Sequence, residues 1–372
     1  MNFTISDEQR ELIDAVTAFL DKHSPESEVR RLMHEGGAAD PGVWSLLAGQ
    51  LGLAGLIVPE EYGGGGFGFL DFALVAERVG AALLVGPLLS TVGAATAVTL
   101  STDAELKSAY LPGLASGDRV GTLALAEESG NWDVTAVETT ATTGADGQLR
   151  VTGVKMYVAD GQHADVYLVS ARSVTGTVGL YLVDAGIPEV RTAALSTLDL
   201  TRPQARVEFT GAPARPLVEE EGAAALIERV MATAVVLLAA EQVGGAQKCL
   251  DMAVDYAKIR VQFGRPIGSF QAIKHKCADM LLDVESARSA AYYAASVLDD
   301  DSDSPLIAAA LAKAHCSAAY TRVAGENIQI HGGIGFTWEH PAHLYFKRAK
   351  TSEILFGDPA WQRERLAQLV GI

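Results

Sequence analysis

The chain has 372 residues, of which 49% are hydrophobic and 20% are charged, so it is long enough for two or three packed units around a large core. Its net charge of −17 argues against nucleic acid as a partner, because the phosphates of a nucleic acid would be repelled. No apolar run has the length of a membrane span, and the stretch from Met1 to His23 is typical of an amphipathic helix rather than a targeting peptide. Cys249, Cys277 and Cys316 lack metal-site spacing, and we expect free thiols in a reducing cytoplasm.

Residues 1–118 are predicted to form a helical domain. A cap signal at Ser6 opens the first helix, and further helices are expected over residues 41–52, 69–79, 88–100 and 102–110. The stretch 53–66 ends in four glycines, which favour a flexible connector. It does not match a phosphate-binding loop, because no lysine follows and Glu60 and Glu61 carry the wrong charge.

In residues 119–221 the spacing of apolar residues changes from the helical period to the two-residue period of strands. Strands are predicted over residues 120–126, 148–158, 165–171, 179–184 and 206–210. Turn signals such as Asp160-Gly161 separate these runs, and Pro213 and Pro216 mark the exit. Short strands joined by hairpin turns indicate an antiparallel sheet or barrel.

Residues 222–372 are predicted to be helical again, with helices over 223–258 and 269–298, a third from Pro305 and a last one containing 361–369. Ser269 is the expected N-cap of the second helix. The acidic run 299–303 is expected to be a solvated loop, and the basic run 343–350 to lie on the bundle surface. The predicted fold is therefore α+β: an N-terminal helical domain, a middle antiparallel β domain and a C-terminal four-helix bundle.

The turn between the first two bundle helices carries positive charge around one aromatic side chain. Gly264 and Pro266 interrupt the helix, and Arg260 and Arg265 flank Phe263. Cations beside a helix N-terminus suit a phosphate, and an aromatic ring can stack on a base. A plain helical corner with solvated cations remains the alternative.

Two motifs resemble the acyl-CoA dehydrogenase family. Residues 260–271, RVQFGRPIGSFQ, are similar to its R-x-x-F-G-x-P-[IL]-x-x-F-Q signature, and residues 329–336, QIHGGIGF, to its Q-x-x-G-G-x-G-[FY] segment. They occur in the family's order and spacing, and the likeness covers essentially the whole chain. The resemblance implies FAD as cofactor, an acyl-CoA thioester as substrate, α,β-dehydrogenation to the trans-2-enoyl-CoA, and an electron-transfer flavoprotein or similar acceptor.

The resemblance also implies positions for the cofactor. Arg260 would contact the FAD pyrophosphate across a subunit contact, Phe263 would lie by the adenine side, and Tyr157 would flank the flavin ring. Residues 125–130 and 153–159 resemble the family's two flavin strands, although Ala126 and Ala159 stand where many members carry threonine. The implied cofactor contacts are Arg260, Gln262, Phe263, Ile267, Phe270, Gln271, Gln329, Gly332, Gly333, Leu125, Ala126, Tyr157 and Ala159.

The reaction needs a carboxylate base, and its usual position is substituted. Phe356 occupies the glutamate position of the family's Y-E-G-T segment, and Ala234 aligns with the base that some members carry on the first bundle helix. Glu241, two turns after Ala234, is the predicted base, because its neighbours Gly244 and Gly245 are expected to leave a hollow beside it. A buried carboxylate held by a cation is the alternative for Glu241, and Asp358 is a second candidate base.

Two functions remain open from the sequence. The first is a homotetrameric acyl-CoA dehydrogenase that uses Glu241. The second is a non-catalytic subunit of an α2β2 heterotetramer, which would supply Arg260 and the Gln329 loop to a neighbour's FAD. Similar actinobacterial chains that act on CoA thioesters of steroid side chains also lack the usual glutamate, so a bulky acyl group is compatible with this sequence.

Overall fold

The computed structural model describes residues 5–372, and Met1–Thr4 of the expected N-terminal helix lie outside the described residues. The chain divides into two compact units. Unit 1 contains the residues up to Arg31, Phe69–Leu84 and Val235–Ile372, and unit 2 contains Leu32–Gly68 and Val85–Ala234. The three-part division at residues 118 and 221 stays a prediction.

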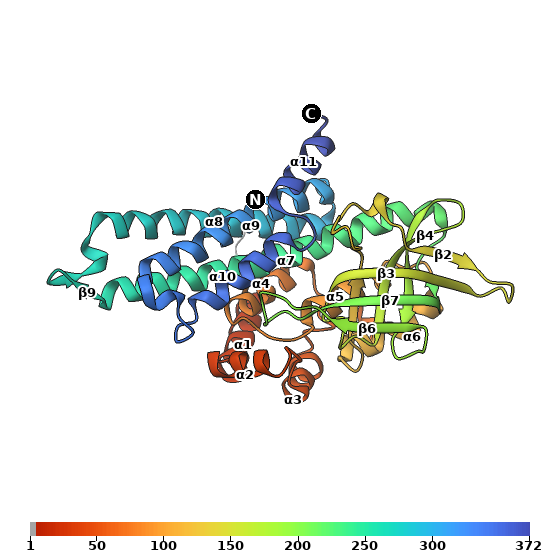
Figure 1. The fold of residues 1–372 in the computed structure, drawn as a ribbon, viewed down its shortest axis with the longest axis horizontal. Coiled ribbons are helices and arrows are strands. Elements are labelled where there is room, and N and C mark those ends of the chain that lie inside the picture. Colours follow the sequence, from red (N-terminus) through yellow and green to blue (C-terminus); the bar gives the residue numbers. More distant parts are fainter. Residues whose placement is uncertain (1–4) are drawn as a thin grey trace. The chain divides into compact units, whose positions relative to one another are not determined.

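Unit 1 is helical, and its long helices α8 and α9 pack along one another (Figure 1). A capping box opens α1, because the Ser6 hydroxyl accepts from the Gln9 amide while the Gln9 side chain accepts from the Ser6 amide. Its helices, two of which continue into unit 2, are α1 (Asp7–His23), α2 (Glu26–His34), α4 (Phe69–Ala81), α7 (Glu220–Ile259), α8 (Gln271–Asp300), α9 (Pro305–His331), α10 (Ala342–Ile354) and α11 (Pro359–Val370).

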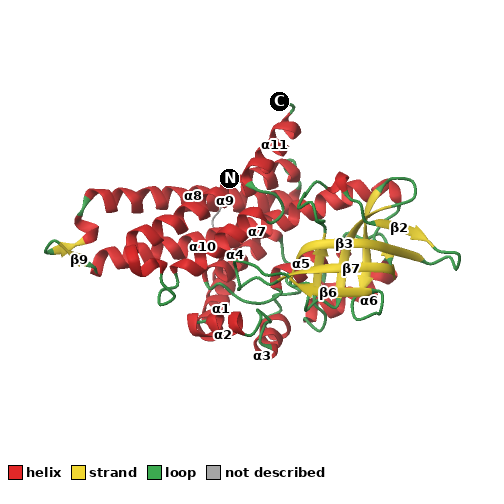
Figure 2. Ribbon diagram, in the orientation of Figure 1, coloured by secondary structure: helices red, strands yellow, loops and turns green. Residues whose placement is uncertain are grey.

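Unit 2 contains a sheet with the strand order β6-β7-β3-β2-β4-β5-β8, with β1 beside β4 (Figure 2). Its core is apolar, and Tyr167 and Phe209 meet edge to face at 5.8 Å. The strands are β1 (Gly121–Ala124), β2 (Thr140–Thr143), β3 (Leu149–Ala159), β4 (Val166–Arg172), β5 (Val178–Asp184), β6 (Val190–Ala194), β7 (Gln204–Pro213) and β8 (Arg215–Pro216). Its helical segments are α3 (Pro41–Ser45), the π-helix Leu46–Gln50, α5 (Leu88–Thr99) and α6 (Ala104–Ser116).

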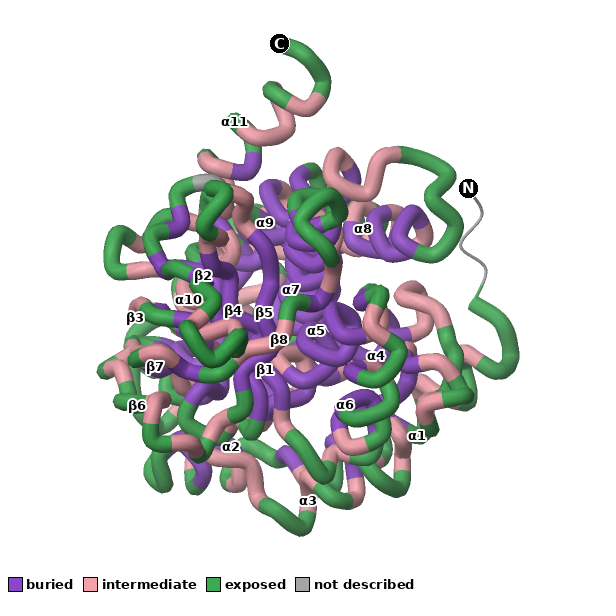
Figure 3. Tube along the Cα trace, turned by 90° about the vertical axis from the view of Figure 1, so that its right-hand side faces the viewer, coloured by how far each residue is buried: buried purple, intermediate pink, exposed green. Residues whose placement is uncertain are grey.

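The α+β class and the helix–sheet–helix order are confirmed, with two differences in the sheet. β2, β6 and β8 were not predicted, and the pairing is not wholly antiparallel, because β1 and β2 pair with β4 in parallel. Figure 3 shows α5 and β4 mostly in the colour of buried residues, in agreement with their apolar sequences.

Three local predictions in the C-terminal part are wrong. The N-cap of α8 is Phe270, because Ser269 lies in a short 3-10 turn and its hydroxyl donates to the Pro266 carbonyl oxygen. The loop predicted over residues 299–303 begins only at residue 301, because Asp299 and Asp300 belong to α8, and the Asp299 carboxylate accepts the Phe69 and Leu70 amides at the start of α4. In the basic run, Arg348 is buried, with 2% of its surface exposed.

Among residues 5–372, α7 alone has the length and apolarity of a membrane span. Within its most apolar 18-residue window, 78% is buried in the protein, as expected of a core helix. The three cysteines are free thiols, with Cys249 and Cys316 buried.

Candidate active site

The turn between α7 and α8 is a two-residue hairpin whose tip is exposed. β9 (Val261–Gln262) pairs with β10 (Arg265–Pro266), and Phe263 and Gly264 both have positive φ, at 53° and 78°. Such a pair of left-handed residues is typical of the tight hairpin turn that matches strand twist. Phe263 is 92% exposed, so its ring is presented for contact with another group.

The residues that follow the hairpin hold it in shape. The Ile267 amide donates to the Arg260 carbonyl oxygen at 2.8 Å, and the Arg265 guanidinium lies 4.1 Å from the centre of the Phe270 ring. Phe270 is the N-cap of α8, and its side chain cannot accept a hydrogen bond, so the first amides of this 30-residue helix gain no cap from it. The hairpin and its cations therefore adjoin a long helix N-terminus, which suits a phosphate.

The second predicted cofactor segment follows α9. Gln329 is exposed in the last turn, and Gly332 has a φ of 65°, which favours glycine. A Cβ on Gly332 or Gly333 would meet nothing within 4 Å among the described residues. The backbone at these glycines is therefore accessible to a ligand.

In unit 2, the two predicted flavin strands are joined by a buried ion pair. The Lys155 ammonium on β3 donates to the Glu127 carboxylate at 2.8 Å and to the Leu125 carbonyl oxygen at 3.1 Å. Burial lowers the pKa of Lys155 to about 8, an effect opposed by Glu127. The Met156 amide donates to the Ala126 carbonyl oxygen at 2.9 Å, so both motif segments form one local structure.

Tyr157 lies at an irregularity of β3. The pairing of β3 with β7 shifts register between Lys155 and Val158, and Tyr157 has a φ of 56° and is 38% exposed. A bulge re-aims a side chain out of the regular pleat. Ala159 follows, and its carbonyl oxygen accepts from the Thr122 hydroxyl at 2.6 Å, so a hydroxyl does lie beside this position.

The predicted base, Glu241, is engaged inside unit 1. One oxygen of its carboxylate lies 2.5 Å from the Arg348 guanidinium on α10, and each side chain is 3% exposed. A carboxylate held this way is directed at its partner. The role of Glu241 as base stays a prediction, but this geometry matches the alternative of a buried carboxylate held by a cation.

The hollow predicted beside Glu241 is wrong. A Cβ on Gly244 would lie 1.7 Å from the Glu77 carbonyl oxygen on α4, and one on Gly245 would lie 2.3 Å from the Tyr320 ring on α9. The same crossing brings Gly80 against the backbone of Glu241, at 1.9 Å. The glycines let helices approach closely, so the space that they leave is filled by neighbouring atoms.

The segment that aligns with the family's usual base is a fixed turn. Phe356 and Gly357 have positive φ values of 60° and 94°, and Gln362 donates to the Phe356 carbonyl oxygen at 2.7 Å. Asp358, the second candidate base, is the N-cap of α11 and accepts from the Trp361 amide at 2.8 Å. Its carboxylate therefore already has a structural role.

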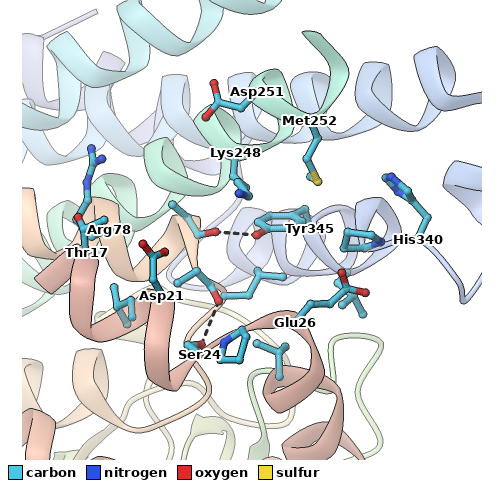
Figure 4. A pocket seen from close by; sticks show the side chains of 18 residues that line it. Thr17, Asp21, Ser24, Glu26, Arg78, Lys248, Asp251, Met252, His340 and Tyr345 are labelled. Carbon is cyan, nitrogen blue, oxygen red and sulfur yellow. Dashed lines mark hydrogen bonds between the residues drawn. The ribbon is translucent and has the colours of Figure 1, made fainter. Parts of the chain in front are cut away.

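Unit 1 contains a cavity of about 630 Å³ (Figure 4). It is bordered by α1, the end of α4, α7 and the start of α10, and the Tyr345 hydroxyl in its wall donates to the Ala81 carbonyl oxygen. The cofactor residues predicted from the sequence do not border it, whereas His340 does.

The residues present fit FAD. An exposed aromatic ring at 263 with arginines 260 and 265 suits an adenine and its phosphates, and the open glycines at 332 and 333 allow backbone contact. Tyr157 and the backbone of residues 125–126 and 159 offer a surface for the flavin within unit 2.

Comparisons with known proteins identify the family of the whole chain. Residues 6–118, 122–211 and 220–371 match the N-terminal, middle and C-terminal domains of acyl-CoA dehydrogenase. The chain is 38% identical to "Acyl-CoA dehydrogenase IpdE2" of Mycolicibacterium smegmatis, over 96% of this chain and 98% of that one.

Two solved structures have the same fold. The ChsE4-ChsE5 complex of Mycobacterium tuberculosis contains a chain with a TM-score of 0.91 and 31% identity, with complete coverage of both chains. The Tcur3481-Tcur3483 steroid ACAD gives a TM-score of 0.91 and 31% identity, over 99% of this chain and 98% of that one.

The fold is that of a flavin-dependent oxidoreductase. The chain belongs to the acyl-CoA dehydrogenase family. Its cofactor is FAD and its substrates are acyl-CoA thioesters.

Sequence reasoning missed Arg348. Its position in a run of basic residues favoured the surface, and nothing in the sequence pairs it with Glu241, 107 positions earlier. The available signal was the position of Arg348 on the apolar face of its helix. Leu344, Tyr345 and Ser352, which lie at helical spacing around it, are also buried.

Proposed function

We propose that the chain is one of two related subunits of an α2β2 acyl-CoA dehydrogenase. In this assembly it supplies its hairpin and its Gln329 loop to the FAD of the partner chain. The partner chain supplies the carboxylate that removes the α-proton of the thioester. The product is the trans-2-enoyl-CoA.

The Glu241–Arg348 pair carries this proposal. A general base must reach the α-proton and accept it, whereas the Glu241 carboxylate contacts a buried guanidinium at 2.5 Å. Phe356 has no carboxylate, and Asp358 caps α11. At each of these three positions, the side chain either lacks a carboxylate or uses it in a structural contact, which supports a base on the partner chain.

The chain's own residues would bind and orient the cofactor. Arg260 and the α8 N-terminus would neutralise the pyrophosphate, Phe263 would stack on the adenine, and the Gly332–Gly333 backbone would contact the adenosine. FAD, when bound, supplies the hydride acceptor of the dehydrogenation. An electron-transfer flavoprotein or a similar carrier would then reoxidise it, in the cytoplasm.

A bulky acyl group is the proposed substrate class. One solved relative is titled a steroid ACAD, and Phe356 stands where the family's usual glutamate would be. Similar steroid-type chains also lack that glutamate, so a large, apolar acyl group suits the assembly, since burying it removes apolar surface from water.

Expression with and without a related chain from the same genome tests the proposal. The chain alone should be colourless, and the co-purified pair should be a yellow α2β2 tetramer that bleaches with one of a panel of straight, branched and sterol acyl-CoAs. A yellow homotetramer that bleaches on its own would contradict the proposal. It would favour the alternative, in which Glu241 leaves Arg348 and acts as the base.

A further inference from the structure

Three aromatic rings connect the two cofactor segments of unit 1. His331 on α9 stacks on Tyr256 of α7, with ring centres 4.3 Å apart, and it contacts His340 in a tilted arrangement, with ring centres 4.1 Å apart. His331 is buried, with 5% of its surface exposed. Its Nδ1–H donates to the Asn327 carbonyl oxygen at 2.8 Å, which fixes the orientation of the ring.

Two of these rings, Tyr256 and His331, adjoin the segments that the cofactor assignment uses. The Tyr256 carbonyl oxygen accepts the Arg260 amide at 2.8 Å, so Tyr256 lies in the turn from which the hairpin emerges. His331 is the last residue of α9 and directly precedes Gly332. A Cβ on Gly335 would lie 2.9 Å from the His331 Cβ, so the loop folds back onto His331.

We propose that His331 is a positioning residue for FAD. By stacking on Tyr256 it fixes the Gly332–Gly333 backbone relative to the Arg260–Arg265 hairpin. The two glycines themselves cannot provide this order, since a Cβ at either would have no neighbour among the described residues and glycine restricts the backbone least. The inference rests on the assignment of FAD to these two segments.

The charge of the stack makes the arrangement sensitive to acid. Burial lowers the pKa of His331 and that of His340, and each ring lies beside the other, so a proton on one opposes a proton on its neighbour. From α2, Glu26 favours and Arg30 disfavours a proton on His340. On α10, the positive charge of Lys347 disfavours a proton on His343, and His343 and His340 disfavour protons on one another. Tyr256 faces His331 from α7.

The stack should lose stability in acid. Both histidines have a pKa below the ordinary value of 6.5, so the neutral stack is fully stabilising above 6.5, and this contribution is lost as the pH falls through the lowered values. The loop should therefore hold the adenosine end firmly in neutral buffer and less firmly in acid.

The experiment compares His331→Ala, which removes the ring, with His331→Phe, which keeps a ring that cannot be protonated. His315→Ala is the matched control, because His315 lies on the same helix and bonds to Ser286 outside the stack. The FAD dissociation constant of the flavin-containing assembly is measured by fluorescence at about pH 7.5 and about pH 5.5. Hydrogen exchange of the amides of residues 332–336 gives a readout that does not need the cofactor.

We expect His331→Ala to weaken FAD binding by about tenfold at neutral pH and to speed exchange in the loop. His331→Phe and His315→Ala should bind within about twofold of the wild type at neutral pH, and His331→Phe should weaken less in acid than the wild type, because only His340 remains to be protonated. Unchanged FAD affinity in His331→Ala, or an equal loss in His331→Phe, would overturn the inference. A wild-type assembly that takes up no FAD would overturn the cofactor assignment together with it.

Discussion

The Glu241 carboxylate and the Arg348 guanidinium form a buried ion pair at 2.5 Å between α7 and α10. Removing one partner of such a pair leaves an uncompensated charge in the core, whereas removing both does not. We therefore expect Arg348→Met to lower the free energy of unfolding by about 3–5 kcal/mol. The Glu241→Gln/Arg348→Met double variant should lose much less than the two single variants together.

Urea unfolding followed by circular dichroism measures these differences. Arg10→Met is the control, because its pair with Asp7 is exposed and should contribute less than about 1 kcal/mol. Additive losses in the double variant would show that the two side chains do not interact in solution.

The close crossing of α4 and α7 makes Gly244 irreplaceable. A Cβ there would lie 1.7 Å from the Glu77 carbonyl oxygen, which is backbone and cannot rotate away. Gly244→Ala should therefore destabilise unit 1 by about 3 kcal/mol or more, or prevent folding. Gly325→Ala on α9 should instead be neutral or stabilising by about 0.5–1 kcal/mol, since its Cβ would meet the Phe346 ring at an ordinary 3.9 Å. Thermal denaturation of both variants measures this difference, and equal stabilities would contradict the close approach of α4 and α7.

Replacing Phe263 should weaken FAD binding without changing the stability of the fold. Because its ring is 92% exposed, Phe263→Ala should change the free energy of unfolding by less than about 0.5 kcal/mol. Loss of a stacked base should weaken FAD binding by roughly tenfold. Titration of the flavin-containing assembly with FAD tests this, and unchanged affinity would remove Phe263 from the site.

Acid should weaken unit 2 through Glu127. Burial alone would raise the pKa of this carboxyl, but hydrogen bonds from Lys155 and Thr139 outweigh it and hold the pKa at about 2. The stabilisation is therefore complete above the ordinary value of 4.5 and is lost as the pH falls toward about 2. Relative to the wild type, Glu127→Gln should show a smaller loss of stability over this range. Parallel stability curves for the two proteins would contradict the ion pair.

The sequence predicted an element correctly wherever apolar residues recurred at a regular spacing over a long segment. The helix expected over residues 223–258 is α7, and the change of period at residue 119 marked the sheet. β6 was missed because it is mostly exposed and carries no apolar alternation, so only its pairing with β7 makes it a strand. Likewise, the cap on α4 comes from Asp299, 230 positions away, which no local signal indicates.

The site was predictable in its chemistry but not in its spatial relations. Arg260 and Phe263 could be placed in a turn because glycine and proline specify the turn locally. The surroundings of Glu241 could not be predicted. A glycine pair indicates either an open space or a close neighbour, and the sequence does not distinguish the two.

The most direct test of the account is single-turnover bleaching of the bound flavin by acyl-CoA in the α2β2 assembly. The double variant Glu241→Gln/Arg348→Met is the appropriate protein, because it lacks the carboxylate without leaving a buried charge unpaired. We predict a bleaching rate within about threefold of the wild type, since the proposed base lies on the partner chain. A fall of about 10²-fold or more, with FAD content unchanged, would identify Glu241 as the base and contradict the account.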